Sequence, residues 1–522
     1  MDALPDERSR RLLDRARSSG EAVPSDALID WLAAPEPGSL GVSRYLAEIW
    51  RERVDLQEAF PGLHLDPQQR DRFLVWAHHF AASEADAPAR FVPGGFEAAD
   101  DLTAPSGPSA VVSTLRPGVS VVGYLRAVLG LGGSARRLAH LARMAGEEVH
   151  EVAYDHTTSP LDHPWVAISA SSGARDASRD TSQNTSQNTS QNTSQNTSGA
   201  LDIVALCVNG AQTERLTRAL GPAALEGRYR VGLWFWELER FPAEQAGGFA
   251  HVDEVWVTSS FVADAVRAAA PPRVGVHIIP LGTDVAVDAA DRGDAITRSQ
   301  LHLPDGVLLG ITFDYASRAA RKNPVGLIDA FRRAFPSPLE LGRRGPFLVL
   351  KTLNARLHPE DATALRAAVG ATNRPDIVVI DRQFGFAEQR AFLRELNVFV
   401  SLHRSEGYGN SLLEAMGHGH PVIATGYSGN LAFMTDANSW LVPFSVRQVP
   451  AGTGIYDAGA RWADPDVESA AHAMREVTFG LDTPEVRRRT SQARSDVAAV
   501  LDGRAGAAFV RARLDAIRRD RP

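Results

Sequence analysis

The chain has 522 residues but only one cysteine, and no apolar run approaches the roughly 18 residues that a membrane-spanning helix needs. A single cysteine excludes an internal disulfide framework and fits a reducing cytosol. Cys207 lies within the apolar run 203–208, so we expect a buried structural thiol there. The N-terminus also lacks the basic and apolar regions of a signal peptide. Together these absences predict a cytoplasmic protein.

The chain also lacks an excess of positive charge, since 63 Asp and Glu outnumber 55 Lys and Arg and the net charge is −8. This balance gives no electrostatic basis for nucleic acid as a partner. Hydrophobic residues make up 44% of the chain and charged residues 23%, which is typical of an ordinary globular protein. A chain of this length should hold two or three domains.

The most informative stretch, 403–417, follows the apolar run 397–402 and precedes a second apolar run at 421–425. This pattern predicts a buried parallel strand, a glycine-bearing loop, a short helix that ends at Gly417, and another strand. The amides of such a loop and the helix dipole attract an anion. Glu406 and Glu414 frame the loop, and carboxylates accept hydrogen bonds from sugar hydroxyls. The stretch therefore favours a sugar joined to a phosphate as the ligand.

Glu406 and Glu414, with seven residues between them, resemble the paired-glutamate motif of the retaining family 4 glycosyltransferases, also described as glycosyl transferases group 1. Residues 405–411 and 421–430 strengthen the resemblance. It implies an α/β protein of the GT-B fold, in which two Rossmann-like, doubly wound domains face a cleft. It also implies sugar transfer from a nucleotide-diphosphate sugar to an acceptor hydroxyl with retention, without a metal or other cofactor. The alternative is a solvated helix face with two acids, which does not account for the apolar strands on both sides.

The domain organisation follows from composition and from this resemblance. A polar Thr-Ser-Gln-Asn repeat, 181–198, cannot build a core and predicts a disordered insertion at 171–200. We expect the following parts: a helical accessory module at 1–103, a linker at 104–117, an N-terminal Rossmann-like acceptor domain at 118–285, a C-terminal Rossmann-like donor domain at 286–480, and C-terminal helices at 481–522, the last of which crosses back to the first domain.

Two places in the N-terminal domain attract attention. Gly132 and Gly133 follow the first predicted strand, 119–125, and match the family's glycine loop that approaches the donor diphosphate; a plain tight turn is the alternative. Trp236 and Glu237 follow the strand 229–235, at the edge where α/β sheets bind ligands. There Trp236 would stack on a sugar and Glu237 would accept acceptor hydroxyls. Alternatively, the aromatic residues belong to the core beneath a turn.

In the C-terminal domain, Arg318, Arg321 and Lys322 follow the strand 307–313. The resemblance implies that an arginine and a lysine of this loop neutralise the donor diphosphate. Lys322 matches the lysine, and we favour Arg318 over Arg321 as the arginine, with Arg321 as a further donor-binding residue; solvated surface charge is the alternative. The resemblance also implies that Glu406 binds the transferred sugar and Glu414 the ribose. The remaining donor contacts are expected along the motif loop, at Gly407, Tyr408, Gly409, Asn410, Ser411 and Leu412.

A formal metal-binding pattern, Asp464-x-Asp466, precedes a predicted helix, and we interpret it as a helix cap. The expected partners are a nucleotide-sugar donor and a carbohydrate or lipid-linked acceptor of surface polysaccharide or glycoconjugate synthesis. Peripheral association with the inner face of the membrane is a further expectation. The competing hypotheses are a GT-B epimerase or phosphorylase and a catalytically silent sugar-nucleotide-binding or scaffold protein. Neither the donor base nor the oligomeric state follows from the sequence.

Overall fold

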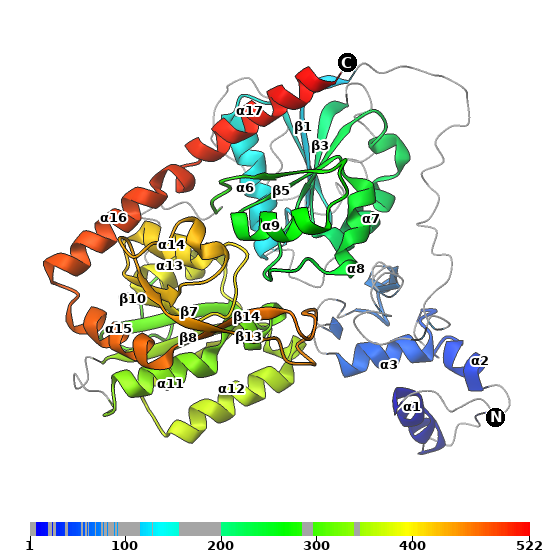
Figure 1. The fold of residues 1–522 in the computed structure, drawn as a ribbon. Coiled ribbons are helices and arrows are strands. Elements are labelled where there is room, and N and C mark those ends of the chain that lie inside the picture. Colours follow the sequence, from blue (N-terminus) through cyan, green and yellow to red (C-terminus); the bar gives the residue numbers. More distant parts are fainter. Residues whose placement is uncertain are drawn as a thin grey trace, which may run out of the picture. The chain divides into compact units, whose positions relative to one another are not determined.

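The computed structural model describes residues 115–155 without Val128, 200–283, 296–338 and 345–521, together with parts of 7–91 (Figure 1). The chain divides into two compact units, residues 1–112 with 156–160, and residues 113–155 with 161–522. The Thr-Ser-Gln-Asn repeat and residues 104–114 of the expected linker lie outside the described residues. No helix in the described part of the chain has the length and apolar character needed to cross a membrane.

The first unit is helical in its described parts. Ser43 begins α3, where its side chain accepts a hydrogen bond from the Leu46 amide at 3.3 Å. The buried carboxylate of Glu48 binds the Arg15 guanidinium at 2.5 and 2.8 Å, which joins α1 to α3. The helices are α1 (Glu7–Ser18), α2 (Leu28–Ala33) and α3 (Arg44–Glu52).

The second unit contains two parallel sheets. The described strands of the first sheet lie in the order β2-β1-β3-β4-β5-β6, so the winding direction reverses between β1 and β3. Its strands are β1 (Arg116–Gly123), β2 (Val149–Ala153), β3 (Leu201–Cys207), β4 (Tyr229–Leu233), β5 (Glu254–Val257) and β6 (Gly275–Ile278). Its helices are α6 (Gly130–Met144), α7 (Gly210–Leu220), α8 (Ala243–Ala246) and α9 (Ser260–Ala269). Cys207 is buried, as predicted, and burial raises the pKa of its thiol.

The described strands of the second sheet lie in the order β12-β11-β10-β7-β8-β9, with the reversal between β7 and β10. In open α/β sheets, ligands bind outside the carboxyl ends of the strands at such a reversal. The strands are β7 (Leu308–Asp314), β8 (Phe347–Leu353), β9 (Ile377–Asp381), β10 (Val398–Ser401), β11 (Val422–Thr425) and β12 (Trp440–Val442). The helices are α10 (Ala319–Lys322), α11 (Pro324–Ala334), α12 (Pro359–Thr372), α13 (Phe386–Glu395), α14 (Asn410–His418) and α15 (Val467–Phe479).

Two further elements complete this unit. The strands β13 (Phe444–Gln448) and β14 (Arg461–Pro465) pair antiparallel between β12 and α15. After α16 (Pro484–Leu501), the last helix, α17 (Arg504–Asp520), runs along α6 of the first sheet (Figure 1). Its residues Val510 and Leu514 are buried in the same core cluster as Val121 of β1.

The structure corrects two local predictions. The helix α14 does not end at Gly417, which is buried inside it; it ends at His418, and Gly419 caps it with φ 81° in the left-handed region that glycine favours. Gly132 and Gly133 do not lie in a loop before α6 but in its first turn. The α/β class with doubly wound, Rossmann-like sheets is confirmed.

Candidate functional site

The loops that follow β7 and β10 meet at the reversal of the second sheet. We call residues 314–323 the cation loop and residues 402–409 the motif loop. Asn323 donates a hydrogen bond from Nδ2 to the Leu402 carbonyl at 2.9 Å, and the Arg404 amide donates to the Arg321 carbonyl at 2.8 Å. Because these bonds join the two loops directly, their side chains are held at one place at the carboxyl edge of the sheet.

Lys322, Arg321 and Glu406 form a buried ion cluster at this place. Lys322 Nζ lies 2.5 Å from Glu406 Oε1, and Arg321 Nη1 lies 3.1 Å from Glu406 Oε2 and 2.8 Å from the Ser405 carbonyl. Burial by itself raises the pKa of Glu406, but the charges of Lys322 and Arg321 outweigh burial and lower it to about 2. Burial lowers the pKa of Lys322, and Glu406 opposes that change. The cluster therefore holds a fixed carboxylate between two cations.

Glu237, from the segment after β4 in the first sheet, extends this cluster. Its Oε1 lies 3.9 Å from Arg321 Nη2, and its Oε2 accepts a hydrogen bond from the Tyr456 hydroxyl at 3.3 Å. Arg321 thus lies between two carboxylates that come from different sheets. The side chain of Glu237 remains 26% exposed, so it is open to a ligand.

Trp236, the neighbour of Glu237, is part of the core. Its side chain is buried, its Nε1 donates to the Arg240 carbonyl at 2.7 Å, and its ring lies 5.6 Å from that of Tyr456. This placement agrees with the second of the two interpretations of the sequence, core aromatics beneath a turn. A buried ring offers little surface for stacking on a sugar.

Close backbone contacts fix the motif loop. A Cβ at Gly407 would lie 2.4 Å from the Trp236 carbonyl oxygen, so only glycine fits there. The Gly407 carbonyl accepts a hydrogen bond from Ser259 Oγ at 2.6 Å. The Glu406 amide donates to Ser428 Oγ at 2.7 Å. These contacts set the orientation of Glu406 from both sides of the loop.

The first turn of α14 follows directly. Gly409 has φ 94°, and Asn410 and Ser411 are partly exposed at the helix N-terminus, where backbone amides and the helix dipole favour an anion. Leu412 and Glu414 are buried on the same helix. The Tyr408 ring packs edge-on against Phe433 at 5.2 Å, and burial raises the pKa of its hydroxyl.

Arg318 lies apart from the ion cluster. Its Nη1 lies 2.5 Å from His358 Nδ1 and 3.3 Å from His358 Nε2. Within the described residues, His358, Glu360 and Asp361 form the one group whose ligand atoms are close enough to hold a metal ion. The neighbouring guanidinium of Arg318 disfavours a divalent cation at that group, because like charges repel at this distance.

Gly132 has a structural reason to be small. A Cβ at Gly132 would lie 2.5 Å from the Tyr124 carbonyl oxygen and 2.6 Å from that of Ala127. The close approach of α6 to the segment after β1 therefore requires glycine at 132. This is a packing reason within the first turn of a helix, which neither interpretation of the sequence included.

Three polar residues of the site were not identified from the sequence as site residues: Tyr456, Ser428 and His403. His403 is fully buried at the start of the motif loop, with Nδ1 3.2 Å from Ser401 Oγ and Nε2 3.2 Å from Asn430 Oδ1, and burial lowers its pKa. Its position next to the motif was a usable signal. For Tyr456 and Ser428, the contacts depend on loops distant in sequence.

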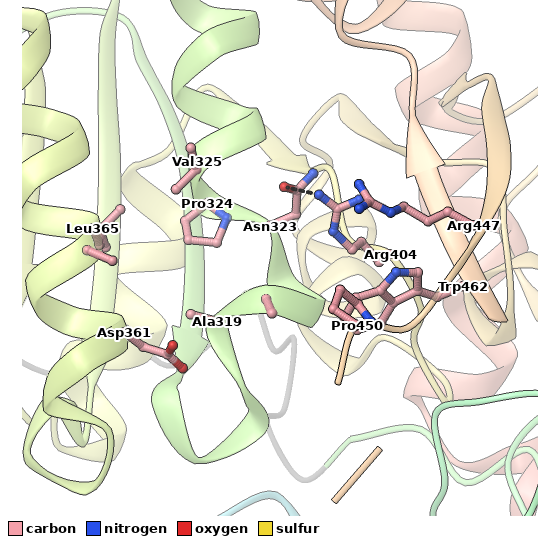
Figure 2. Close-up of a pocket in the computed structure, with 12 residues that line it drawn as sticks. Ala319, Asn323, Pro324, Val325, Asp361, Leu365, Arg404, Arg447, Pro450 and Trp462 are labelled. Atoms are coloured by element: carbon pink, nitrogen blue, oxygen red, sulfur yellow. Dashed lines mark hydrogen bonds between the residues drawn. The ribbon is translucent and has the colours of Figure 1, made fainter. Parts of the chain in front are cut away.

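A pocket of about 290 Å³ lies beside the cation loop (Figure 2). Figure 2 shows Asn323 bonded to Arg404 on one wall, with Arg447 next to it and Leu365 and Asp361 on the other side.

Arg404 and Arg447 both contact Asp464, and Asp466 caps α15 by accepting from the Ser469 amide at 2.6 Å. The interpretation of the Asp464-x-Asp466 pair as a helix cap is therefore confirmed for Asp466, whereas Asp464 pairs with the two arginines and Pro465 lies in β14 instead of at the first helical position.

One family model matches part of this chain, and several solved structures are similar to it. Residues 355–449 match the family model described as glycosyl transferases group 1. Sucrose-phosphate synthase from Thermosynechococcus elongatus is 16% identical, with a TM-score of 0.50 over 78% of this chain and 99% of that chain, which supports the fold. A glycosyltransferase from Rickettsia africae is 13% identical, with a TM-score of 0.47 over 77% of this chain and 97% of that chain.

A pneumococcal O-GlcNAc transferase, solved with UDP and GlcNAc, is 13% identical with a TM-score of 0.40 over 59% of this chain. The match spans 56% of that protein, so the chain covers little more than half of its length. No curated protein sequence matches the chain significantly.

Proposed function

We propose that the chain is a GT-B glycosyltransferase that transfers a sugar from a nucleotide-diphosphate sugar to an acceptor hydroxyl with retention; the group 1 segment and the fold support this. The observation that carries the proposal is the convergence of Lys322, Arg321 and Glu406 with the first turn of α14 at the reversal of the second sheet. The resemblance of residues 405–414 to the retaining enzymes is the reason to propose retention.

The chemistry of such a transfer matches the charges of the site. The bond between the anomeric carbon and the diphosphate oxygen breaks, and its electron pair leaves with the diphosphate. Fixed cations and backbone amides aimed at the developing charge are the strongest means of lowering the barrier. We assign this task to Lys322, to Arg321 and to the amides between Gly407 and Leu412, which lie at the end of the motif loop and in the first turn of α14.

The assignment of the arginine differs from the one that the sequence favours. Arg321 reaches Glu406, whereas Arg318 is bound to His358 and would have to leave it to take part. Glu406, fixed as a carboxylate, would bind hydroxyls of the transferred sugar. Glu414, one turn into α14, would bind the ribose of the nucleotide.

The resemblance is also the reason to propose transfer without a metal. In this proposal Lys322 and Arg321, which pair with Glu406 and Glu237 in the structure, would turn to the diphosphate. We extend the proposal to a carbohydrate or lipid-linked acceptor in surface polysaccharide or glycoconjugate synthesis, with peripheral attachment to the inner face of the membrane.

The test begins with donor binding. UDP-, GDP- and dTDP-sugars are added one at a time, and the shift in melting temperature identifies the nucleotide that binds. Product formation is then measured with and without a panel of sugar acceptors, for the wild type and for Glu414→Ala. The proposal expects acceptor-dependent transfer that Glu414→Ala abolishes without a loss of folded protein.

Other outcomes would contradict the proposal. Free nucleotide released at the full rate without an acceptor would indicate an epimerase. Binding of a nucleotide sugar with no turnover under any condition would indicate a catalytically silent binding protein. Anomeric configuration, read from the product by NMR, tests retention separately.

A further inference from the structure

The hairpin β13–β14, residues 444–465 with its connecting segment, follows the second sheet in the chain but packs against residues of the first sheet's domain. Val449, Tyr456 and Trp462 are buried in the same core cluster as Trp236 and Leu238, which follow β4. The same hairpin adds a charged contact, because Arg461 binds both oxygens of Glu239 at 2.7 and 3.0 Å. The hairpin therefore brings its own side chains to the segment that carries Glu237.

Tyr456 is the hairpin residue that reaches the ion cluster. It is 3% exposed, its hydroxyl donates to Glu237 Oε2 at 3.3 Å, and its ring packs on Trp236. Burial raises the pKa of Tyr456, and the neighbouring Arg321 opposes this only in part, so the hydroxyl stays protonated at neutral pH. Tyr456 thus remains a hydrogen-bond donor.

Glu237 is held on one side and open on the other. Tyr456 holds Oε2, whereas Arg321 Nη2 stands 3.9 Å from Oε1, which is too long for a hydrogen bond. A carboxylate is an acceptor-only group with several lone pairs, so Glu237 retains capacity to accept from a substrate hydroxyl. Arg321 lies between this carboxylate and that of Glu406.

We infer that Tyr456 is a positioning residue for the acceptor: it orients Glu237, which receives the hydroxyl of a sugar or polyol acceptor opposite the donor site. The inference rests on the proposed function and adds to it that the hairpin β13–β14 completes the acceptor side. A hydroxyl held in one geometry reacts faster because its orientation is already set. Tyr456 acts through Glu237 and need not touch the donor.

The experiment compares Tyr456→Phe, Glu237→Gln and their double variant with the wild type. Steady-state kinetics are measured separately for donor and acceptor, and donor hydrolysis is measured without acceptor. We expect Tyr456→Phe to lower kcat/KM for the acceptor about tenfold, the size expected for one hydrogen bond to a charged group. The KM for the donor and the rate of donor hydrolysis should stay within about twofold of the wild type, the usual scatter between variants with intact binding.

The double variant shows whether Tyr456 acts through Glu237 or whether the two residues affect acceptor kinetics independently. If Tyr456 acts through Glu237, adding Tyr456→Phe to Glu237→Gln should cause no further loss. The matched control is Arg461→Ala, which removes the exposed contact of the same hairpin with Glu239 and should leave acceptor kinetics unchanged. Melting temperatures show whether each variant is folded.

Two results would overturn the inference while leaving the proposed function intact. One is acceptor kinetics in Tyr456→Phe equal to those of an active wild type. The other is an equal loss in acceptor-dependent transfer and in donor hydrolysis, which would place Tyr456 in donor binding or in general stability. A wild type that turns over no nucleotide sugar would instead contradict the proposed function and the inference together.

Discussion

The reversals of the two parallel sheets occupy equivalent topological positions but use their arginines differently. Beside the first, Arg137 of α6 donates to the carbonyls of Leu281, Val500 and Leu501 at 3.0, 2.9 and 2.7 Å. At the second, Arg321 and Lys322 face the carboxylate of Glu406. Backbone carbonyls cannot move away without unfolding local structure, whereas a side-chain ion pair can be exchanged for a substrate. We infer that the contacts of Arg137 at the first reversal stabilise the fold, whereas the ion cluster at the second reversal serves the proposed catalysis.

Removal of Lys322 should have the largest effect, and it tests whether the second reversal is the catalytic one. In Lys322→Ala, one of the cations that would stabilise the departing diphosphate is lost, and we expect kcat to fall by about 10²–10³-fold, as for loss of one fixed donor at a developing anion. Arg321 still pairs with Glu406, so the protein should stay folded. Circular dichroism and single-turnover kinetics check both points. Wild-type kcat in a folded variant would place the chemistry elsewhere.

A low pH should weaken the second reversal and not the first, because the carboxylate of Glu406 in the ion cluster can take up a proton, whereas the backbone carbonyls that bind Arg137 do not titrate. The pKa of Glu406 is about 2 in the folded protein, against an ordinary value of 4.5. A lowered pKa adds stability that is fully present above the ordinary value and is lost as the pH falls toward 2. The contribution is on the order of 3 kcal/mol, from about 1.4 kcal/mol per pKa unit.

Glu406→Gln provides the test of this pH dependence. We expect the wild type to be the more stable protein at pH 6 and the difference to shrink as the pH falls from about 4.5 toward 2, because the unfolded chain then takes up a proton on Glu406 that the folded protein binds only near pH 2. Thermal melts across this range measure it. A difference between the two proteins that stays constant with pH would contradict the charge assignment of Glu406.

The converse experiment targets Arg137. Arg137→Met keeps the apolar stem but removes hydrogen bonds to three carbonyls, and we expect a loss of about 2–3 kcal/mol, since buried acceptors are left without their charged donor. Arg218→Met, on α7 of the same sheet, removes an exposed pair with Glu214 and should cost less. Calorimetry measures both, and donor affinity should change little. A large loss of donor affinity at unchanged stability would assign the first reversal to the chemistry.

The position of the candidate site at the second reversal could be predicted from the sequence because its signals are local. Apolar runs mark β10 and β11, and the glycines and acids of the motif loop lie between them within a few residues. Lys322 follows β7 closely enough for the same reasoning. The position of the ion pair between Lys322 and Glu406 follows from strand order, which the resemblance supplied.

The other features of the site depend on contacts between residues that are distant in sequence, and no local sequence pattern indicates such contacts. β13 is exposed along its whole length and shows no apolar run, so no strand was predicted there. The choice between Arg318 and Arg321 turns on the short helix α10, which points Arg321 at Glu406 and leaves Arg318 on His358. The contact between Tyr456 and Glu237 joins residues 219 positions apart. Periodicity and spacing carry no information about such pairs.

The smallest expected effect concerns the contact between the two halves. Ser259 begins α9 by accepting from the Val262 amide at 3.3 Å, and its hydroxyl donates to the Gly407 carbonyl at 2.6 Å, so one side chain serves the first sheet's fold and the motif loop. Ser259→Ala should cost about 1 kcal/mol of stability, the usual value of a helix cap. Because Gly407 adjoins Glu406, we also expect a donor KM several-fold higher. Ser259→Thr retains the hydroxyl and should restore the donor KM. A donor KM equal to that of the wild type in Ser259→Ala would mean that the motif loop keeps its geometry without this contact.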